Sequence, residues 1–505
     1  MENPNNQIES VAYQNIPNDM PNQSIPYYGE TEEQKTIRAR MFSLMWLPTI
    51  LYAIFYTFCL YDNFHSITMP IFVVGTVGYC AYLLKSFRGC KVKELKVQKM
   101  SIFCAIGMLA LAVSTCLTGN EFVILMSNAG IFCLLVSMLL FEFCSTKNWT
   151  LAKGIGSITK AVIGAVASIE DPFRDFSCFR SKRGKHKTNR AEYVMIGIAV
   201  ALPILIIVMI LLVQADAVFA NMILGIFRLD IPSARVVGIV LTFVYAVFAA
   251  YCGMRYLGKK TIAADSRDMR RWEPVVANTI LVLVSAVYLL FCFIQIFSLF
   301  LGQMKLPDGY TYAKYAREGF FQLLFVCLIN VGLVLFTMGC FKENKAKKIL
   351  LTVISACTYI MIASSAYRMC LYIREYHLTF LRVFVLWMLV MIAVWLGGII
   401  AQIYRENFPL FRYTIVIATV FVFAFGIARP DYWIAKYDVD YLSNEQEAYY
   451  LAGLSTDAAP VLTGRTGEWA DDYLENIEND FNEGMREYNF SHAKAGKLYA
   501  KNNIK

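Results

Sequence analysis

The arrangement of apolar residues constrains this chain more than any other feature of its sequence. These residues gather in long blocks, such as 194–213 and 414–428, instead of recurring at amphipathic spacing. A helix needs about 20 apolar residues to cross a hydrocarbon layer of about 30 Å. Hydrophobic residues make up 57% of the chain and charged residues 17%, whereas about half and about a quarter are usual in soluble proteins. The sequence therefore predicts an all-α, polytopic transmembrane helical bundle.

Eleven blocks have roughly the length of a span. They cover residues 41–60, 67–85, 100–118, 122–144, 194–213, 237–257, 275–301, 320–341, 349–367, 380–403 and 414–428. The chain then divides into a disordered N-terminal arm at 1–40, a transmembrane domain at 41–428 and a small helical C-terminal appendage at 429–505. Because the arm lacks the short apolar core of a signal peptide, we expect the first span to be an uncleaved anchor. Only residues 119–121 separate the third and fourth blocks, which requires a tight helical hairpin.

Basic residues predict the orientation, since loops rich in Lys and Arg stay in the cytoplasm. With the N-terminus inside, the cytoplasmic segments carry 31 Lys and Arg residues and the short outer loops carry 7. An odd number of spans then places the C-terminal appendage outside. The net charge of +9 is explained by this topology, and no nucleic-acid partner is expected.

The cytoplasmic loop at 145–193 contains an amphipathic element. Apolar residues recur at helical spacing through 151–169, with Lys153 and Lys160 on other faces. We expect a helix that lies on the inner membrane surface. The alternative is a twelfth span, in which each lysine would cost several kcal/mol at depth. The basic run at 180–190 either contacts anionic lipid headgroups or anchors the topology.

Several classes of protein are disfavoured by missing motifs. The chain has no phosphate-binding GxxxxGKS/T loop, no dinucleotide-binding GxGxxG, no HExxH and no GxSxG. The cysteines form no CxxC pair, and the four histidines are dispersed along the chain. We therefore expect no cofactor, no metal site and no disulfide framework, and the balance is against an enzyme.

Three parts of the sequence resemble a bacterial membrane protein family of unknown function. They are the outer-loop segment 310–322, the segment 368–382, and the tail segments DYWIAKY (431–437) and LSTDAAP (454–460). The family is the domain of unknown function 4173, with its relative 4153. The resemblance covers most of the chain from the third span onward. It implies a multi-helix fold in a bacterial plasma membrane and assigns no activity. Where the family pattern has Gly before Leu-Thr, this chain has His377.

The same segments concentrate ionisable groups at the outer ends of the spans. The candidate ligand-binding residues are Arg317, Glu318, Arg368, Tyr372, Arg374, Glu375, His377 and Arg382. If the segment 368–382 is helical, five residues share one face that points toward the bundle, near Arg317 and Glu318: Arg368, Tyr372, Glu375, Thr379 and Arg382. Arginine suits phosphate or carboxylate because its planar fork donates two parallel hydrogen bonds. The alternative is that these residues pair with one another or reach to lipid phosphates.

Uncharged polar residues also lie within the predicted spans. They are Asn128, Asn278, Gln295, Asn330 and Gln402. Such residues favour hydrogen bonds between helices over contacts with a substrate. Glu142 is the one acid within a predicted span, which suits either proton coupling or simple hydration near the interface.

Three functions remain open from the sequence. The first is a binding or transport module for an anionic or lipid-linked ligand at the outer membrane surface. The second is a sensor or scaffold whose tail binds a protein partner. The third is an intramembrane transferase, for which Glu318, Glu375 and Asp216 are the placed acids or bases. Membrane lipids are partners in all three.

Overall fold

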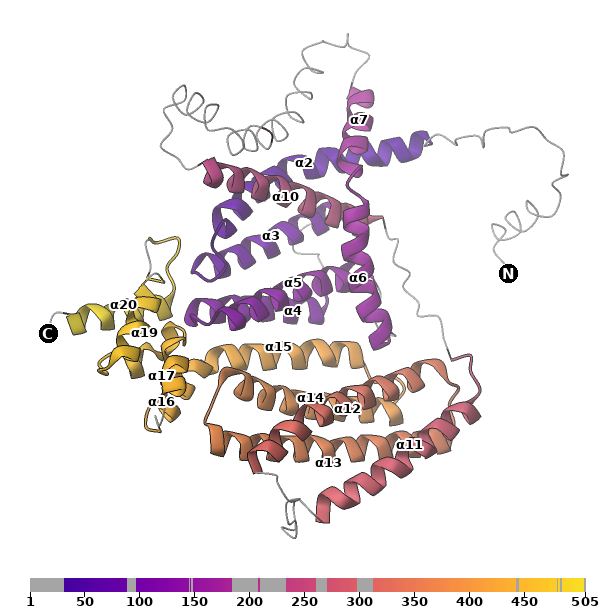
Figure 1. Cartoon of the computed structure of the whole chain (residues 1–505). Coiled ribbons are helices and arrows are strands. Elements are labelled where there is room, and N and C mark those ends of the chain that lie inside the picture. The colour runs from indigo at the N-terminus through magenta and orange to yellow at the C-terminus, as the bar shows by residue number, and fades with distance from the viewer. Residues whose placement is uncertain are drawn as a thin grey trace.

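The computed structural model describes residues 31–88, 97–144, 146, 149–183, 208, 233–259, 270–297, 312–441, 445–478, 480–481 and 484–503 (Figure 1). Ten of its helices are long and apolar enough to cross a membrane. The prediction of an all-α, polytopic bundle is confirmed. The block at 194–213, the fifth predicted span, lies outside the described residues.

The described helices have the following order along the chain. They are α2 (Glu32–Leu60), α3 (Thr68–Arg88), α4 (Lys99–Leu117), α5 (Glu121–Phe143), α6 (Leu151–Ala167), α7 (Asp171–Arg183), α10 (Ser233–Gly258), α11 (Pro274–Gln295), α12 (Tyr312–Cys340), α13 (Lys345–Tyr376), α14 (Phe380–Tyr404), α15 (Leu410–Ala428), α16 (Pro430–Asp438), α17 (Glu445–Ala452), η3 (Thr456–Ala458), α18 (Ala459–Leu462), α19 (Glu468–Glu478) and α20 (Phe490–Asn503).

The first helix starts earlier than the sequence predicted. Residues 32–40 are helical, whereas the disordered arm was expected to extend to residue 40. Thr31 explains the difference, because its Oγ1 accepts a hydrogen bond from the Gln34 N–H at 3.3 Å while its own N–H donates to Gln34 Oε1 at 3.1 Å. Such a capping box satisfies two N–H groups that a helix N-terminus otherwise leaves unpaired.

The spans form two groups joined by α15 (Figure 1). One group contains α2, α3, α4, α5 and α10, and the other contains α11, α12, α13 and α14. α15 packs against α4 and α5 on one side and against α14 on the other. As predicted, α4 and α5 form a tight hairpin, whose turn consists of residues 118–120.

α6 and α7 do not run with the bundle. Figure 1 shows α6 crossing the ends of the neighbouring helices, and the axis bends by 56° between α6 and α7. Two glycines of α6 allow its neighbours to approach closely. A Cβ at Gly154 would overlap Phe411 of α15, and one at Gly164 would overlap Tyr256 of α10. α6 therefore ties α15 to α10, and we call this side of the molecule the α6 end. That α6 lies on a membrane surface stays a prediction.

The C-terminal tail, from α16 to α20, sits at the opposite end of the bundle, which we call the tail end (Figure 1). It has its own small core, which includes Ile434, Leu451, Leu462, Tyr473 and Ile477. Leu378, from the turn between α13 and α14, and Phe380, the first residue of α14, pack against this core. A segment of this size makes only a marginal core alone, so the contact with the bundle helps to order it.

Candidate functional site

The predicted site residues of segment 368–382 lie at the tail end, but on two helices. α13 ends at Tyr376, His377 adopts a φ of 60°, and α14 begins at Phe380. The sequence predicted one helical face shared by Arg368, Tyr372, Glu375, Thr379 and Arg382. That prediction is wrong, because the backbone with positive φ at His377 breaks the helix. Glycine adopts a positive φ more easily than other residues, so His377 holds a backbone conformation that non-glycine residues rarely adopt.

Arg368 faces the bundle, as the sequence predicted. Its side chain is buried on α13, and Nη2 donates to Gln295 Oε1 of α11 at 3.4 Å. The same oxygen accepts a hydrogen bond from Ser364 Oγ at 2.7 Å. Gly319 of α12 leaves room for the guanidinium, since a Cβ there would overlap Arg368 Nη1. Arg368 thus joins three helices and does not reach the outer surface.

Arg382 is used within the turn. Its Nη1 donates to the carbonyl oxygens of Tyr376 and His377, and its guanidinium lies 4.4 Å from the centre of the Tyr372 ring. It therefore satisfies carbonyl groups that the C-terminus of α13 leaves unpaired. Arg374 and Glu375, by contrast, are exposed.

The remaining two predicted residues lie at the start of α12. Arg317 and Glu318 belong to this helix, and their side chains are outside the described part of the structure. Gly319 follows them directly and touches Arg368, so the backbone of this segment is close to the predicted partner.

The turn between α13 and α14 is fixed on the tail. The Leu378 N–H donates to Asp438 Oδ1 at 3.0 Å, and the Phe380 N–H donates to the Tyr450 hydroxyl at 2.7 Å. The His377 ring stacks on Tyr441, with ring centres 5.5 Å apart. These contacts place His377, a predicted site residue, against Tyr441 of the tail, and nothing in the sequence indicated this contact.

α16 presents a buried face and an exposed face. Ile434 and Ala435 are buried, while Trp433 and Tyr437 are 54% and 40% exposed. Lys436 is exposed and lies 5.2 Å from the centre of the Trp433 ring. We call the following group the tail-end aromatic surface: Arg374, Tyr376, His377, Trp433, Lys436, Tyr437 and Tyr441. It gathers aromatic rings and cations where the spans α13 and α15 end.

Buried carboxylates fasten the tail to the α4–α5 turn. Asp457 accepts hydrogen bonds from Thr118 Oγ1 at 2.5 Å, from the Gly119 N–H at 3.2 Å and from Ser491 Oγ at 2.5 Å. Asp431 Oδ2 accepts from Asn120 Nδ2 at 2.8 Å. Burial raises the pKa of Asp457, because the donors around it are neutral. The two tail segments that carry the family resemblance therefore meet at one hairpin turn.

Asn489 and two histidines extend this junction. Asn489 Nδ2 donates to the carbonyl oxygens of His65, Thr115 and Thr118 at 2.7, 3.1 and 3.0 Å. The rings of His65 and His492 lie 5.3 Å apart, although the sequence suggested that the histidines are dispersed. Burial, with His65 as a second cause, lowers the pKa of His492 to about 4, and burial also lowers the pKa of His65.

The profile of the family described as "Domain of unknown function (DUF4153)" matches residues 103–464. The chain belongs to the DUF4153 family. The resemblance was thus correct for this family, and membership of its relative 4173 is not established. No curated protein and no solved structure matches the chain. The DUF4153 match includes the α4–α5 turn, Asp431 and Asp457, whereas Asn489 and His492 lie beyond it.

This DUF4153 chain also contains an apolar groove that the sequence did not reveal. It has a volume of about 560 Å³ and is formed by α2, α3, α5, α6 and α10. Its walls include Phe72, Leu135, Val162, Ala249 and Leu257. The groove is apolar, so it differs from the polar cavity expected for a transporter of ions or other polar solutes.

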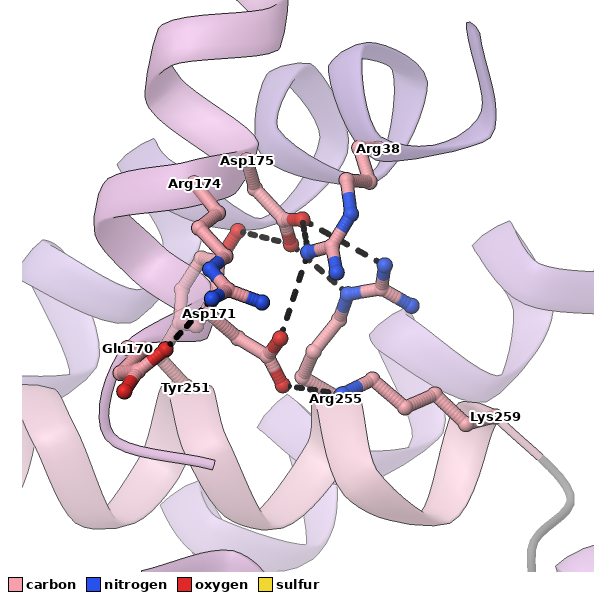
Figure 2. A network of polar contacts seen from close by, with 8 residues as sticks. All are labelled: Arg38, Glu170, Asp171, Arg174, Asp175, Tyr251, Arg255 and Lys259. Atoms are coloured by element: carbon pink, nitrogen blue, oxygen red, sulfur yellow. Dashed lines mark hydrogen bonds and ion pairs between the residues drawn. The ribbon is translucent and has the colours of Figure 1, made fainter. Parts of the chain in front are cut away.

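A network of charges holds α7 at the α6 end (Figure 2). Asp175 is fully buried and accepts hydrogen bonds from Arg38 Nη1 at 2.8 Å, Arg255 Nε at 2.7 Å and the Tyr251 hydroxyl at 3.1 Å. Asp171 accepts from Arg38 Nη1 at 3.2 Å and from Lys259 Nζ at 2.5 Å. Burial alone would raise the pKa of Asp171, but Lys259 and Arg38 outweigh it and the pKa is lowered.

The sequence alone revealed only the basic run at 180–190 and gave no prediction of this network. One signal was present, because Asp171 and Asp175 stand four residues apart and share a face of α7. Their partners come from α2 and α10, which are far away in the sequence. Among the polar residues within spans, Gln295 and Asn330 do bond between helices, since Asn330 Nδ2 donates to Thr358 Oγ1 of α13 at 3.0 Å. Glu142 accepts from the Gln98 N–H at 3.0 Å.

Proposed function

We propose that this multi-pass membrane protein binds an anionic, lipid-linked ligand at the outer surface of a bacterial cell membrane. The tail-end aromatic surface is the binding surface in this proposal. The N-terminus lies in the cytoplasm and the tail outside, an orientation supported by the excess of Lys and Arg in the loops of the α6 end.

The observation that carries the proposal is that exposed aromatic rings and exposed cations lie together where the spans end. Trp433 and Tyr441 are 54% and 53% exposed, Lys436 lies 5.2 Å from the centre of the Trp433 ring, and Arg374 is exposed three residues before His377. Trp and Tyr favour the interface between membrane and water, where one side of the ring is apolar and the other is wet. Lys and Arg at the same level attract a phosphate. A headgroup anchored by a lipid chain meets both kinds of group at this depth.

The predicted ligands divide into two roles under this proposal. Arg374 and His377 contact the ligand, together with Tyr376, which the sequence did not single out. Arg368, Tyr372 and Arg382 act as positioning residues, because the first joins α11, α12 and α13 and the other two hold the turn. For Arg317 and Glu318, ligand binding stays a prediction that rests on the sequence.

Binding can be measured with full-length protein in nanodiscs of neutral phosphatidylcholine, titrated with farnesyl phosphate and, separately, with uncharged farnesol. We expect farnesyl phosphate to bind more tightly. Lys436→Gln should weaken its binding several-fold, which corresponds to about 1 kcal/mol for an exposed charge. Trp433→Ala should weaken the binding of both compounds, because the ring contacts the apolar chain that they share.

Lys497→Gln is the matched control, since Lys497 is exposed on α20 and lies outside the tail-end aromatic surface. Equal affinity for farnesol and farnesyl phosphate in the wild type would refute the anionic part of the proposal. Unchanged binding in both Lys436→Gln and Trp433→Ala would refute the surface.

A second candidate function is a scaffold whose tail binds a protein partner. The packed core of the tail and its buried bonds to the α4–α5 turn favour it, because they give the appendage a defined shape. Crosslinking of a benzophenone side chain at Tyr449, which is 60% exposed, to a protein instead of a lipid would support this alternative. An intramembrane transferase stays a hypothesis from the sequence: Glu375 is exposed, and Asp216 and the Glu318 side chain are outside the described residues.

A further inference from the structure

The apolar groove and the charge network meet at the α6 end. Ile169 and Leu257 line the groove, and each is two residues from a member of the network, Asp171 and Lys259. We propose that this groove binds one acyl chain of an anionic phospholipid and that the charge network holds its phosphate. The charge network lies at the opposite end of the bundle from the tail-end aromatic surface, and no residue of that surface lines the groove, so the site is independent of the proposed function.

The groove suits a hydrocarbon chain. It lies among membrane spans, and its volume of about 560 Å³ is within the range of about 300–1,000 Å³ that is usual for small-molecule sites. Three hydroxyl groups in its wall are already satisfied: Tyr52 bonds Thr76 at 3.0 Å, and Tyr79 bonds Thr49 at 2.9 Å. A chain of methylene groups can therefore occupy the groove without leaving these polar atoms unpaired.

The network suits a phosphate. It contains three cations, Arg38, Arg255 and Lys259, and two carboxylates, Asp171 and Asp175, so it carries one excess positive charge (Figure 2). Asp175 and Arg255 are buried, whereas the Lys259 side chain is 30% exposed. An ammonium group has three N–H donors, and the bond to Asp171 uses one. Lys259 is thus the member of the network best placed to meet a headgroup.

The occupant is an anionic phospholipid because the two parts of the site bind different chemical groups: the groove binds a hydrocarbon chain and the charge network binds a phosphate. An apolar groove alone accepts any chain, and a cationic cluster alone accepts any phosphate. Their positions, two residues apart along both α6–α7 and α10, match a molecule in which a phosphate is joined to acyl chains. Helix α6 crosses the ends of the spans here (Figure 1), and its amphipathic sequence predicts that it lies where headgroups meet hydrocarbon.

The test uses full-length protein in nanodiscs with two photoactivatable lipids. Phosphatidylglycerol and phosphatidylcholine each carry a diazirine in one acyl chain, and labelled peptides are mapped by mass spectrometry. We expect phosphatidylglycerol to label peptides of α5 and α10 more strongly than phosphatidylcholine does. Gly253→Leu should reduce this labelling about fivefold by filling the groove, because a Cβ at Gly253 meets no atom within 4 Å and the backbone need not move.

Gly339→Leu is the matched control, since Gly339 lies near the α6 end of α12, outside the groove, and a Cβ there would also meet no atom within 4 Å. Lys259→Gln should remove the preference for phosphatidylglycerol and leave phosphatidylcholine labelling unchanged. Lys342→Gln controls for this change, because Lys342 is an exposed lysine at the same end, paired with Glu273. Thermal unfolding midpoints identify any variant that fails to fold.

Three results would overturn the proposal. Labelling that Gly253→Leu leaves unchanged would show that the chain binds elsewhere, and absence of labelling in the wild type would show that something other than lipid fills the groove. Equal labelling by the two lipids would remove the role of the network. A competition arm with inorganic phosphate separates the sources of the anion: displacement of the phosphatidylglycerol preference by phosphate alone would assign the network to a free anion.

Discussion

The two ends of the bundle hold their peripheral elements in different ways. At the α6 end, Asp175 is buried against two arginines and a tyrosine. At the tail end, Asp457 is buried against two hydroxyls and a backbone N–H. Against the effect of burial, cations lower the pKa of Asp171 at the first end, whereas burial among neutral donors raises the pKa of Asp457 at the second. The first end should therefore depend on intact charges, and the second on hydrogen-bond geometry and pH.

The largest expected effect is at the α6 end. Asp175→Ala removes the buried carboxylate that pairs with Arg255 and one of the two that pair with Arg38, and breaking a buried pair in this way costs about 3–5 kcal/mol. The thermal unfolding midpoint of the full-length protein in detergent should fall accordingly. Glu170→Ala is the control, since Glu170 pairs with Arg174 in solvent at 2.9 Å and an exposed pair contributes at most about 1 kcal/mol. Equal effects of the two changes would mean that the network does not hold α7.

The next effect concerns pH at the tail end. The pKa of His492 is lowered to about 4 from an ordinary value of 6.5, so the folded state favours the neutral ring. Its contribution to stability is complete above pH 6.5 and is lost as pH falls from 6.5 toward 4. The loss is on the order of 3 kcal/mol at most.

This pH dependence is measured as the difference between wild type and His492→Gln in unfolding midpoint at pH 7.5 and pH 4.5. Asp457 and Asp480, whose pKa values are raised by burial, act in the opposite direction, and the comparison of the two proteins cancels them. His65, whose pKa is also lowered, acts in the same direction in both proteins. If both proteins lose the same stability on acidification, protonation of His492 does not destabilise the contact between the tail and the bundle.

The smallest expected effect is at Asn489. Asn489→Ala removes the donor to three carbonyl groups of the α2–α3 loop and the α4 C-terminus, and unpaired buried polar groups cost about 1–3 kcal/mol. We expect faster proteolysis of the tail with the bundle intact, measured by limited digestion in detergent. Asn476→Ala is the control, because the Asn476 side chain bonds within the tail, to the Ala452 carbonyl oxygen at 3.1 Å. Digestion at the wild-type rate would show that the Asn489 side chain does not fasten the tail.

Long apolar blocks made ten spans predictable, because each span is a local property: about 20 apolar residues form a helix in lipid whatever their neighbours. The α4–α5 hairpin followed from the same logic, since only three residues separate the blocks. The helix break at His377 could not be found this way. Its neighbours in sequence are compatible with a helix, and the turn is held by Asp438 and Tyr450 of the tail.

The candidate site was predicted only in part. The sequence identified Arg368 as a residue that faces the bundle, since a charge at membrane depth avoids lipid. It did not identify Tyr441 as a neighbour of His377, because the tail meets the α13–α14 turn only after α14 and α15 have crossed the bundle. The aromatic surface is therefore a product of packing between segments that are about 60 residues apart, as the bond between Leu378 and Asp438 illustrates.

By itself the sequence determined the all-α membrane bundle, the ten described spans and the helical character of α6, because hydrophobic length and periodicity act within a single helix. Only the tertiary structure decided which charges are paired. Asp175 meets Arg38 and Arg255, and Asp457 meets Thr118 and Ser491, across separations of 34 to 339 positions. Ion pairs and hydrogen bonds act over a few ångströms, so their partners are set by how the helices pack and not by the order of residues in the chain.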